Sequence, residues 1–170
     1  MEEPKAFSGE AGLGAPLENA PNAQPAAPRK VQSVLFICAM NAVRSPMAEA
    51  LAKHFFGKSI YVQSAGARKG EPDGFAHAVL EEIGIDLSRH KPKSVDELEE
   101  WEGLNFDLII SLSPEAHHRA LELTRTVAAH VEYWPTVDPT AFQGSREQKL
   151  DAYRDVRDGL IRRIKDRLQG

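Results

Sequence analysis

Short, uninterrupted apolar runs alternate along this chain with segments in which apolar residues recur every three or four positions. The uninterrupted runs predict four strands, at residues 34–37, 59–64, 106–112 and 131–134. The segments with helical spacing predict five helices, at residues 45–56, 73–84, 95–101, 113–126 and 145–168. Because strands and helices alternate, the sequence predicts an α/β fold: a doubly wound four-stranded parallel sheet with helices on both faces.

Polar residues at the starts of the predicted helices support these boundaries. Asp73 and Ser113 precede helical segments as N-caps, and Ser145 opens a capping box. Ser45 is the predicted N-cap of the helix after the first strand, with Pro46 at its first helical position. Each helix is therefore expected to begin where the apolar pattern changes its period.

The carboxyl ends of the predicted strands are followed by polar residues. In doubly wound sheets, ligands bind beyond this edge of the sheet. The residues that follow the four strands are Cys38, Ser64, Ser113 and Asp138. We therefore expect these four residues to gather at one edge of the sheet.

A seven-residue turn, from Cys38 to Arg44, joins the first strand to the first helix. Such a turn directs several backbone N–H groups into one concavity, to which the helix dipole adds partial positive charge. Arg44 can close that concavity with a planar guanidinium that binds in a bidentate manner. The sequence therefore predicts a site for a tetrahedral oxyanion, the phosphate loop (residues 38–44), after the first strand.

Cys38 lies at the base of this predicted loop. A cysteine beside a helix N-terminus and an arginine ionises more readily than a free thiol. Ser45 can also donate a hydrogen bond to the resulting thiolate, which is a nucleophile aimed at the central atom of a bound oxyanion. The alternative interpretation is a buried, unreactive cysteine at the end of a strand.

These residues carry a resemblance to a known family. The pattern C-x5-R-S, between an apolar strand and the helical segment RSPMAEA, resembles the low-molecular-weight protein tyrosine phosphatase family, which includes thioredoxin-coupled arsenate reductases. The resemblance covers residues 31–170 and implies that Cys38 is the nucleophile and that Arg44 binds the oxyanion. The other residues that it implies for substrate binding are Ala39, Met40, Asn41, Ala42, Val43 and Ser45.

Cleavage of a phosphate ester also needs an acid for the leaving oxygen. The family's general acid is an Asp followed by Pro shortly before the last helix, and Asp138 and Pro139 match that pattern. The resemblance thus implies that Asp138 protonates the leaving group and that Pro139 stiffens its backbone. The alternative interpretation is that these two residues only form a turn.

Three residues are implied as support for the phosphate loop. Asn41 matches the family's loop asparagine, a residue type that tolerates a left-handed backbone. In the family it is tied to a serine after the second strand and to a histidine further on, and Ser64 and His90 stand at those positions. The alternative for His90 is a histidine on a surface loop.

Two departures from the family's pattern fall within the phosphate loop. The family usually has glycine two residues after the nucleophile, where this chain has Met40, and a positive φ there would be strained. Many members carry a second cysteine at the position of Val43. Its absence removes the partner for a protective disulfide.

Two further departures bear on the substrate. The aromatic residues that follow the family's Asp-Pro are replaced by Thr140 and Ala141, although Phe142 is close. The Trp or Tyr that often follows the Ser-Ala-Gly turn is replaced by Arg68 and Lys69, which either favour an acidic substrate or are solvated loop charges. These replacements leave the predicted phosphate chemistry in place and leave the preference for phosphotyrosine open.

Composition narrows the remaining possibilities. The 170 residues have a formal net charge of −4 and no basic block, so nucleic-acid binding is not indicated. No apolar run is long enough to span a membrane, and the acidic N-terminus does not resemble a secretory signal. The single cysteine fits a reducing cytoplasm, and no metal-ligand spacing or cofactor motif is present.

The chain is expected to have one folded domain, residues 31–170. Residues 1–30 are rich in Ala, Pro, Gly and Asn without any period, which predicts a disordered tail. We expect the domain to be a monomer or a weak dimer.

The leading hypothesis for function is a cysteine-dependent phosphatase that acts on protein phosphotyrosine or on a small phosphomonoester. The first alternative is arsenate reduction with an external thiol, because the relay of further cysteines used by the thioredoxin-coupled enzymes cannot run with Cys38 alone. The second alternative is a weakly active phosphate-binding module.

Overall fold

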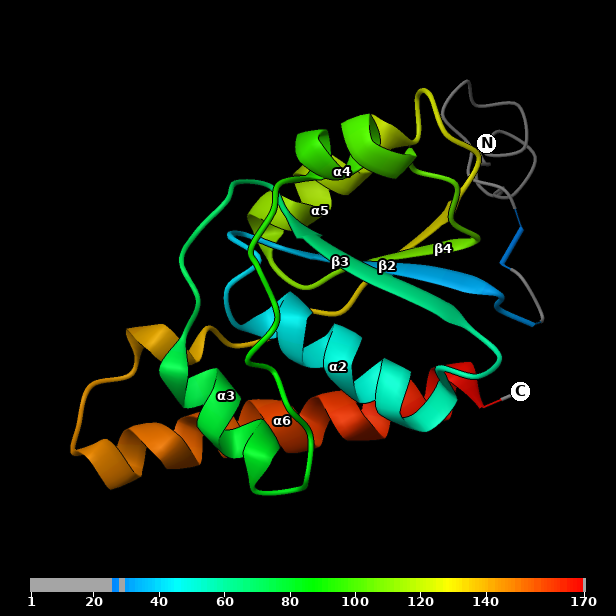
Figure 1. Ribbon diagram of the computed structural model, residues 1–170. Coiled ribbons are helices and arrows are strands. Elements are labelled where there is room, and N and C mark those ends of the chain that lie inside the picture. The colour runs from blue at the N-terminus through cyan, green and yellow to red at the C-terminus, as the bar shows by residue number, and fades with distance from the viewer. Residues whose placement is uncertain (1–25, 28–29, 170) are drawn as a thin grey trace, which may run out of the picture.

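A computed structural model describes residues 26–27 and 30–169 of the chain. The predicted tail, residues 1–30, lies almost wholly outside the described residues, and so does the last residue of the predicted domain. Figure 1 shows the described part as a central sheet with helices above and below it.

Four strands form a single parallel sheet, as the sequence predicts. The strands are β2 (Ser33–Cys38), β3 (Tyr61–Gly66), β4 (Leu108–Ser111) and β5 (His130–Tyr133). Their order in the sheet is β3-β2-β4-β5, with β2 paired in parallel to both β3 and β4. Because all strands run the same way, their carboxyl ends share one edge, on the left in Figure 1.

Helices cover both faces of this sheet, so the predicted doubly wound architecture is confirmed. The helices are α2 (Arg44–Phe56), α3 (Gly74–Glu81), α4 (Val95–Glu102), α5 (Pro114–Leu123), α6 (Arg146–Leu168) and the short 3₁₀ helix η1 (Pro139–Ala141). In Figure 1, α2, α3 and α6 lie below the sheet, and α4 and α5 lie above it.

The central strand β2 explains why its sequence is apolar without alternation. Val34 and Phe36 join the core formed with α2 and α6, whereas Leu35 and Ile37 join the core formed with α4 and α5. All four side chains are fully buried. A strand buried on both faces reads as a continuous apolar run, and it anchors the loop that follows it.

Some predicted boundaries were wrong by a few residues. Strand β3 begins at Tyr61 rather than at Ser59, because Ser59 and Ile60 donate backbone hydrogen bonds to the carbonyl of Phe56 and so extend the turn after α2. Helix α3 ends at Glu81, three residues before the predicted end. Ile83, which was predicted to lie on its apolar face, follows the helix and is 39% exposed.

Within residues 26–27 and 30–169, no helix is long and apolar enough to cross a membrane.

Candidate active site

The first half of the phosphate loop is tied to the segment that follows β3. The backbone carbonyls of Cys38, Ala39 and Met40 accept hydrogen bonds from the N–H groups of residues 67, 68 and 70, at 2.9, 2.8 and 2.8 Å. These bonds continue the pairing of β2 with β3 beyond the end of the sheet. The start of the loop is therefore held by three backbone hydrogen bonds to the segment that follows β3.

Gly66, at the end of β3, allows this close approach. A Cβ atom on Gly66 would lie 2.1 Å from the carbonyl oxygen of Arg68 and 2.7 Å from the backbone nitrogen of Asn41. Atoms at those positions belong to backbone and cannot move aside without moving the loop. Any side chain at residue 66 would therefore displace the phosphate loop.

Asn41 is the turning point of the loop. It has a φ of 54° and is the one residue other than glycine with a positive φ in the described part of the chain, so Met40 carries no such strain. Its side-chain oxygen accepts from the backbone N–H of Lys93 at 3.0 Å. Its side-chain nitrogen donates to the hydroxyls of Ser45 and Ser64, each at 2.9 Å. Asn41 is fully buried, so these bonds replace solvent for every polar atom of its amide.

A directed chain of hydrogen bonds leads from Glu49 to the sulfur. Glu49 can only accept as a carboxylate, so the Ser64 hydroxyl donates to it. The Ser64 oxygen then accepts from Asn41, which donates its other amide hydrogen to Ser45. The chain of hydrogen bonds ends at the Ser45 hydroxyl, which lies 2.9 Å from Sγ of Cys38 and 3.3 Å from the carbonyl oxygen of Ala65. The network therefore connects the sulfur to a buried carboxylate on α2.

The prediction that Ser45 caps the helix was wrong. Helix α2 begins at Arg44, and its N-cap residue Val43 makes no side-chain capping bond. The Ser45 hydroxyl instead contacts the sulfur of Cys38, with the carbonyl of Ala65 at 3.3 Å as a second acceptor. The contact with Cys38 links the helix start to the nucleophile expected from the sequence.

His90 supports the loop from its outer side. Its Nε2 lies 3.1 Å from the backbone carbonyl of Asn41, and since a carbonyl only accepts, the ring nitrogen donates. Burial lowers the pKa of His90, and the hydrogen bond to Asn41 only partly offsets this effect. The ring is therefore neutral at pH 7, with its proton on Nε2.

Arg44 joins the phosphate loop to the segment that carries Asp138. Its Nη1 donates to the carbonyl of Thr136 at 3.1 Å, and its Nη2 lies 3.8 Å from Oδ2 of Asp138. The other carboxylate oxygen of Asp138 accepts from the backbone N–H and the hydroxyl of Thr140, at 3.0 and 2.7 Å. Pro139 is buried and begins η1, which fixes the backbone beside the carboxylate.

The structure thus arranges the predicted residues in two groups that meet at Arg44. Cys38 and Ser45 belong to one group with the supporting residues of the loop, and Asp138 belongs to the other. Among the loop residues, Met40 is 40% exposed, whereas the side chain of Val43 is packed in the core. Any contribution of residue 43 to substrate binding must therefore come from its backbone.

Three residues of this arrangement were not foreseen from the sequence. Glu49 lies on the core side of α2, and an acid within the apolar pattern of that helix was the signal for it. Thr140 binds Asp138 in a local turn, a pattern common after aspartate. Thr136 contributes its backbone carbonyl, and no side-chain pattern marks such a role.

The basic residues near the loop are paired with acids of the protein. Arg68 donates two hydrogen bonds to Glu115, at 2.7 and 2.8 Å, and Lys69 lies 3.4 Å from Glu97. These contacts do not support the expectation that Arg68 and Lys69 select an acidic substrate. Their positive charges are balanced by these two acidic side chains.

A groove of about 670 Å³ borders the segment that carries Asp138 on its α6 side. Its lining includes Thr136, Val137 and Phe142, but not the phosphate loop.

Among the described residues, no cluster of three or more His, Cys, Asp or Glu side chains is arranged to hold a metal ion.

Comparisons with known proteins agree with this fold. A family model described as low molecular weight phosphotyrosine protein phosphatase matches residues 33–169. The chain is 32% identical to an arsenate reductase of Bacillus subtilis (strain 168) over 136 residues. This match covers 78% of this chain and 92% of that protein.

Two solved structures have the same fold. An arsenate reductase in its phosphate-binding state has a TM-score of 0.62 and 28% identity, covering 81% of this chain and 97% of its own. A low molecular weight protein tyrosine phosphatase from T. tengcongensis has a TM-score of 0.66 and 25% identity, covering 81% and 98%. The chain therefore belongs to the low molecular weight phosphotyrosine protein phosphatase family.

Proposed function

We propose that the protein is a cysteine-dependent phosphatase that hydrolyses phosphomonoesters, with protein phosphotyrosine as its substrate class. The observation that carries this proposal is the approach of Arg44 to Asp138, 3.8 Å between Nη2 and Oδ2. Ester hydrolysis needs an acid beside the leaving oxygen. If Arg44 binds the oxyanion, its contact with Asp138 supports a place for this carboxylate near the leaving oxygen.

In the first step, the thiolate of Cys38 attacks phosphorus, forming an S–P bond as the bond to the leaving oxygen breaks. Asp138 gives its proton to that oxygen, so that an alcohol or phenol departs. Arg44 and the N–H groups of the phosphate loop hold the remaining phosphoryl oxygens. The Ser45 hydroxyl stabilises the sulfur as an anion before the attack.

In the second step, water attacks the phosphocysteine. Asp138, now a carboxylate, takes a proton from this water as its oxygen bonds to phosphorus. The S–P bond breaks, inorganic phosphate leaves, and Cys38 returns to its thiolate form. Over the two steps the protein groups are regenerated, and only the phosphomonoester and water are consumed.

An assay of phosphate release tests this proposal. Native protein should hydrolyse p-nitrophenyl phosphate and phosphotyrosine peptides, and Cys38→Ser should lower kcat by a factor of about 10³ or more. The Cys38→Ser variant should still bind inorganic phosphate, which serves as the control for an intact loop. Turnover by Cys38→Ser at the native rate would contradict the role of Cys38.

Arsenate reduction is the second candidate, favoured by the arsenate reductases among the relatives. Cys38 would displace a hydroxyl group of arsenate, and an external thiol would then attack the Cys38 sulfur, releasing arsenite and forming a mixed disulfide. A second external thiol would reduce that disulfide. Both thiols must come from outside, because the chain has one cysteine. Glutathione-dependent arsenite production, measured beside phosphate release, separates the two activities.

A third candidate, a weakly active phosphate-binding module, makes a different prediction in the same assays. Such a module would bind inorganic phosphate, yet Cys38→Ser would change neither phosphate release nor arsenite production.

We also propose that the protein acts in a reducing compartment, since Cys38 has no partner cysteine in the chain.

A further inference from the structure

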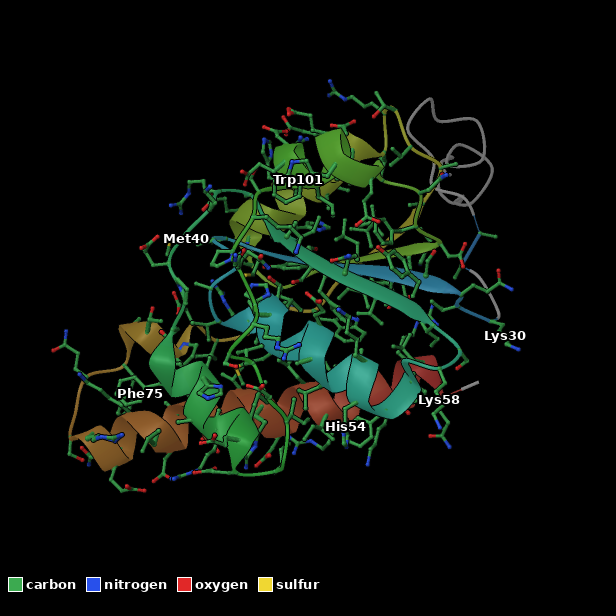
Figure 2. All side chains as sticks on the ribbon, viewed as in Figure 1. Lys30, Met40, His54, Lys58, Phe75 and Trp101 are labelled. Carbon is green, nitrogen blue, oxygen red and sulfur yellow. The ribbon has the colours of Figure 1, made fainter. Side chains whose placement is uncertain are left out.

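Met40 is the residue of the phosphate loop that differs most in chemistry from the glycine usual at its position. Its side chain is 40% exposed, whereas Asn41 beside it is fully buried. Figure 2 shows Met40 at the carboxyl-end edge of the sheet, at the same end of the molecule as Phe75 near the start of α3. A large apolar side chain therefore stands at the rim of the candidate site.

The position of this side chain is fixed by Gly70. A Cβ atom on Gly70 would lie 2.8 Å from Cβ of Met40 and 3.5 Å from its sulfur. The N–H of Gly70 also donates to the Met40 carbonyl at 2.8 Å. The absence of a side chain at residue 70 thus makes room for the thioether against the 67–70 segment.

The two basic side chains nearest to Met40 along the 67–70 segment are each paired with an acidic side chain. Arg68 and Lys69 are paired with Glu115 and Glu97. The hydrogen bonds from Arg68 lower the pKa of Glu115, so this pair is ionised on both sides at neutral pH. Neither basic side chain is available to bind the substrate without giving up its partner.

We propose that Met40 is a specificity-determining residue, which forms one wall of the slot for the leaving group and favours aromatic over small alkyl groups. In-line attack by Cys38 sends the leaving group away from the sulfur, toward the rim where Met40 stands. A thioether makes favourable contacts with aromatic rings, which small alkyl groups cannot match. This inference rests on the proposed function only in that the loop must bind a phosphoryl group.

Binding of phosphonates, which are not hydrolysed, tests the inference without requiring turnover. Phenylphosphonate and methylphosphonate present the same oxyanion and differ in the group that would touch Met40. Calorimetry on native protein should show tighter binding of phenylphosphonate. In Met40→Ala, this preference should fall about 2- to 10-fold, while the affinity for methylphosphonate stays within twofold.

Three further variants sharpen the measurement. Gly70→Ala should lower the preference in the same way, because a Cβ atom at residue 70 would lie 2.8 Å from Cβ of Met40 and force that residue to shift. Met40→Leu, which keeps an apolar side chain of similar size but lacks the sulfur, should retain only the part of the preference that comes from apolar contact. Leu121→Ala removes an apolar side chain of similar exposure (44%) from α5 and should leave both affinities unchanged.

The inference is overturned if native protein shows no preference, or binds neither phosphonate. It is also overturned if Met40→Ala leaves the preference intact or weakens both ligands equally, since Met40 would then shape only the oxyanion site. If the preference depends on Met40 but no phosphomonoester is hydrolysed, the wall is supported and the proposed phosphatase activity is rejected.

Discussion

The phosphate loop and the segment that carries Asp138 meet at Arg44, but they are held in different ways. Asn41 and Ser45 of the loop are fully buried, and their side chains are hydrogen bonded to residues of β3 and α2 or to the segment before α4. In contrast, Val137 is 76% exposed, and the side chain of Asp138 is 42% exposed.

This difference separates two requirements of catalysis. An oxyanion site works best when its donors are fixed before the substrate arrives, because no free energy is then spent on ordering them. A general acid must instead reach leaving groups of different shapes and exchange protons with water. A buried loop and an exposed carboxylate meet these two requirements, and substitutions in the two regions should therefore fail in different ways.

The largest effect is expected in the exposed region. Asp138→Asn removes the proposed proton donor but keeps the size of the side chain, so kcat for an alkyl phosphate should fall by about 10²- to 10⁴-fold. The loss should be smaller for p-nitrophenyl phosphate, whose leaving group is stable as an anion. The free energy of unfolding should stay within about 0.5 kcal/mol of the native value. Steady-state kinetics on both substrates, with denaturant unfolding beside them, measure this.

Equal losses on the two substrates would argue against proton donation by Asp138. A large loss of stability would instead show that the carboxylate has a structural role.

Substitutions in the buried phosphate loop should lower the free energy of unfolding. Asn41→Ala removes the donors to Ser45 and Ser64 and forces alanine into a positive φ. The free energy of unfolding should fall by about 2–4 kcal/mol, and turnover should fall with it. Urea unfolding followed by circular dichroism measures the change.

Asn41→Gly is the matched control for the backbone. Glycine adopts a positive φ freely, so about 1 kcal/mol of the loss should return while the hydrogen bonds stay lost. Equal stability of Asn41→Ala and native protein would mean that the loop does not depend on this network.

A substitution at Thr140 should have a smaller effect, because it would alter the orientation of the Asp138 carboxylate without removing it. Thr140→Val keeps the shape of residue 140 but removes the hydroxyl that donates to Asp138 at 2.7 Å. We expect kcat to fall about 3- to 10-fold, the net value of one typical hydrogen bond, with KM little changed. Thr140→Ser, which keeps the hydroxyl, should behave like native protein, and a loss in both variants would refute the explanation.

The smallest effect is a pH dependence of stability in the buried region. Burial lowers the pKa of His90 in the folded state, so the unfolded chain binds the proton more readily. Stability from this group is therefore present above the unfolded pKa of about 6.5 and is lost as pH falls below it. Denaturant unfolding at pH 7.5, 6.5 and 5.5 should show a steeper loss for native protein than for His90→Gln. Parallel losses would exclude His90 as the source.

The sheet and the nucleophile loop could be predicted because their signals are local. The apolar run of β2 reflects burial on both faces, and the spacing of Cys38 and Arg44 is set within one turn. The same holds for Ser113 and Asp73, whose side chains cap α5 and α3 as predicted. Local chemistry decides each of these features, so neighbouring residues were sufficient to find them.

The errors arose where contacts distant in sequence override a local pattern. Ser45-Pro46 and Ser113-Pro114 are the same dipeptide, yet only Ser113 is an N-cap. Ser45 takes part in the network that ends at Cys38, and the helix begins at Arg44, two residues earlier than an N-cap at Ser45 would place it. The contact between Glu49 and Ser64 joins α2 to β3, and no periodicity within either element encodes it.

The lack of space at Gly66 has a consequence for how such sites are inherited. Since even a methyl group there would collide with the backbone on either side, the end of β3 and the loop after β2 can change only together. The phosphate loop keeps its backbone shape only when the end of β3, which is distant in sequence, leaves room for it. A lineage that lost this glycine would be expected to lose the cysteine chemistry with it.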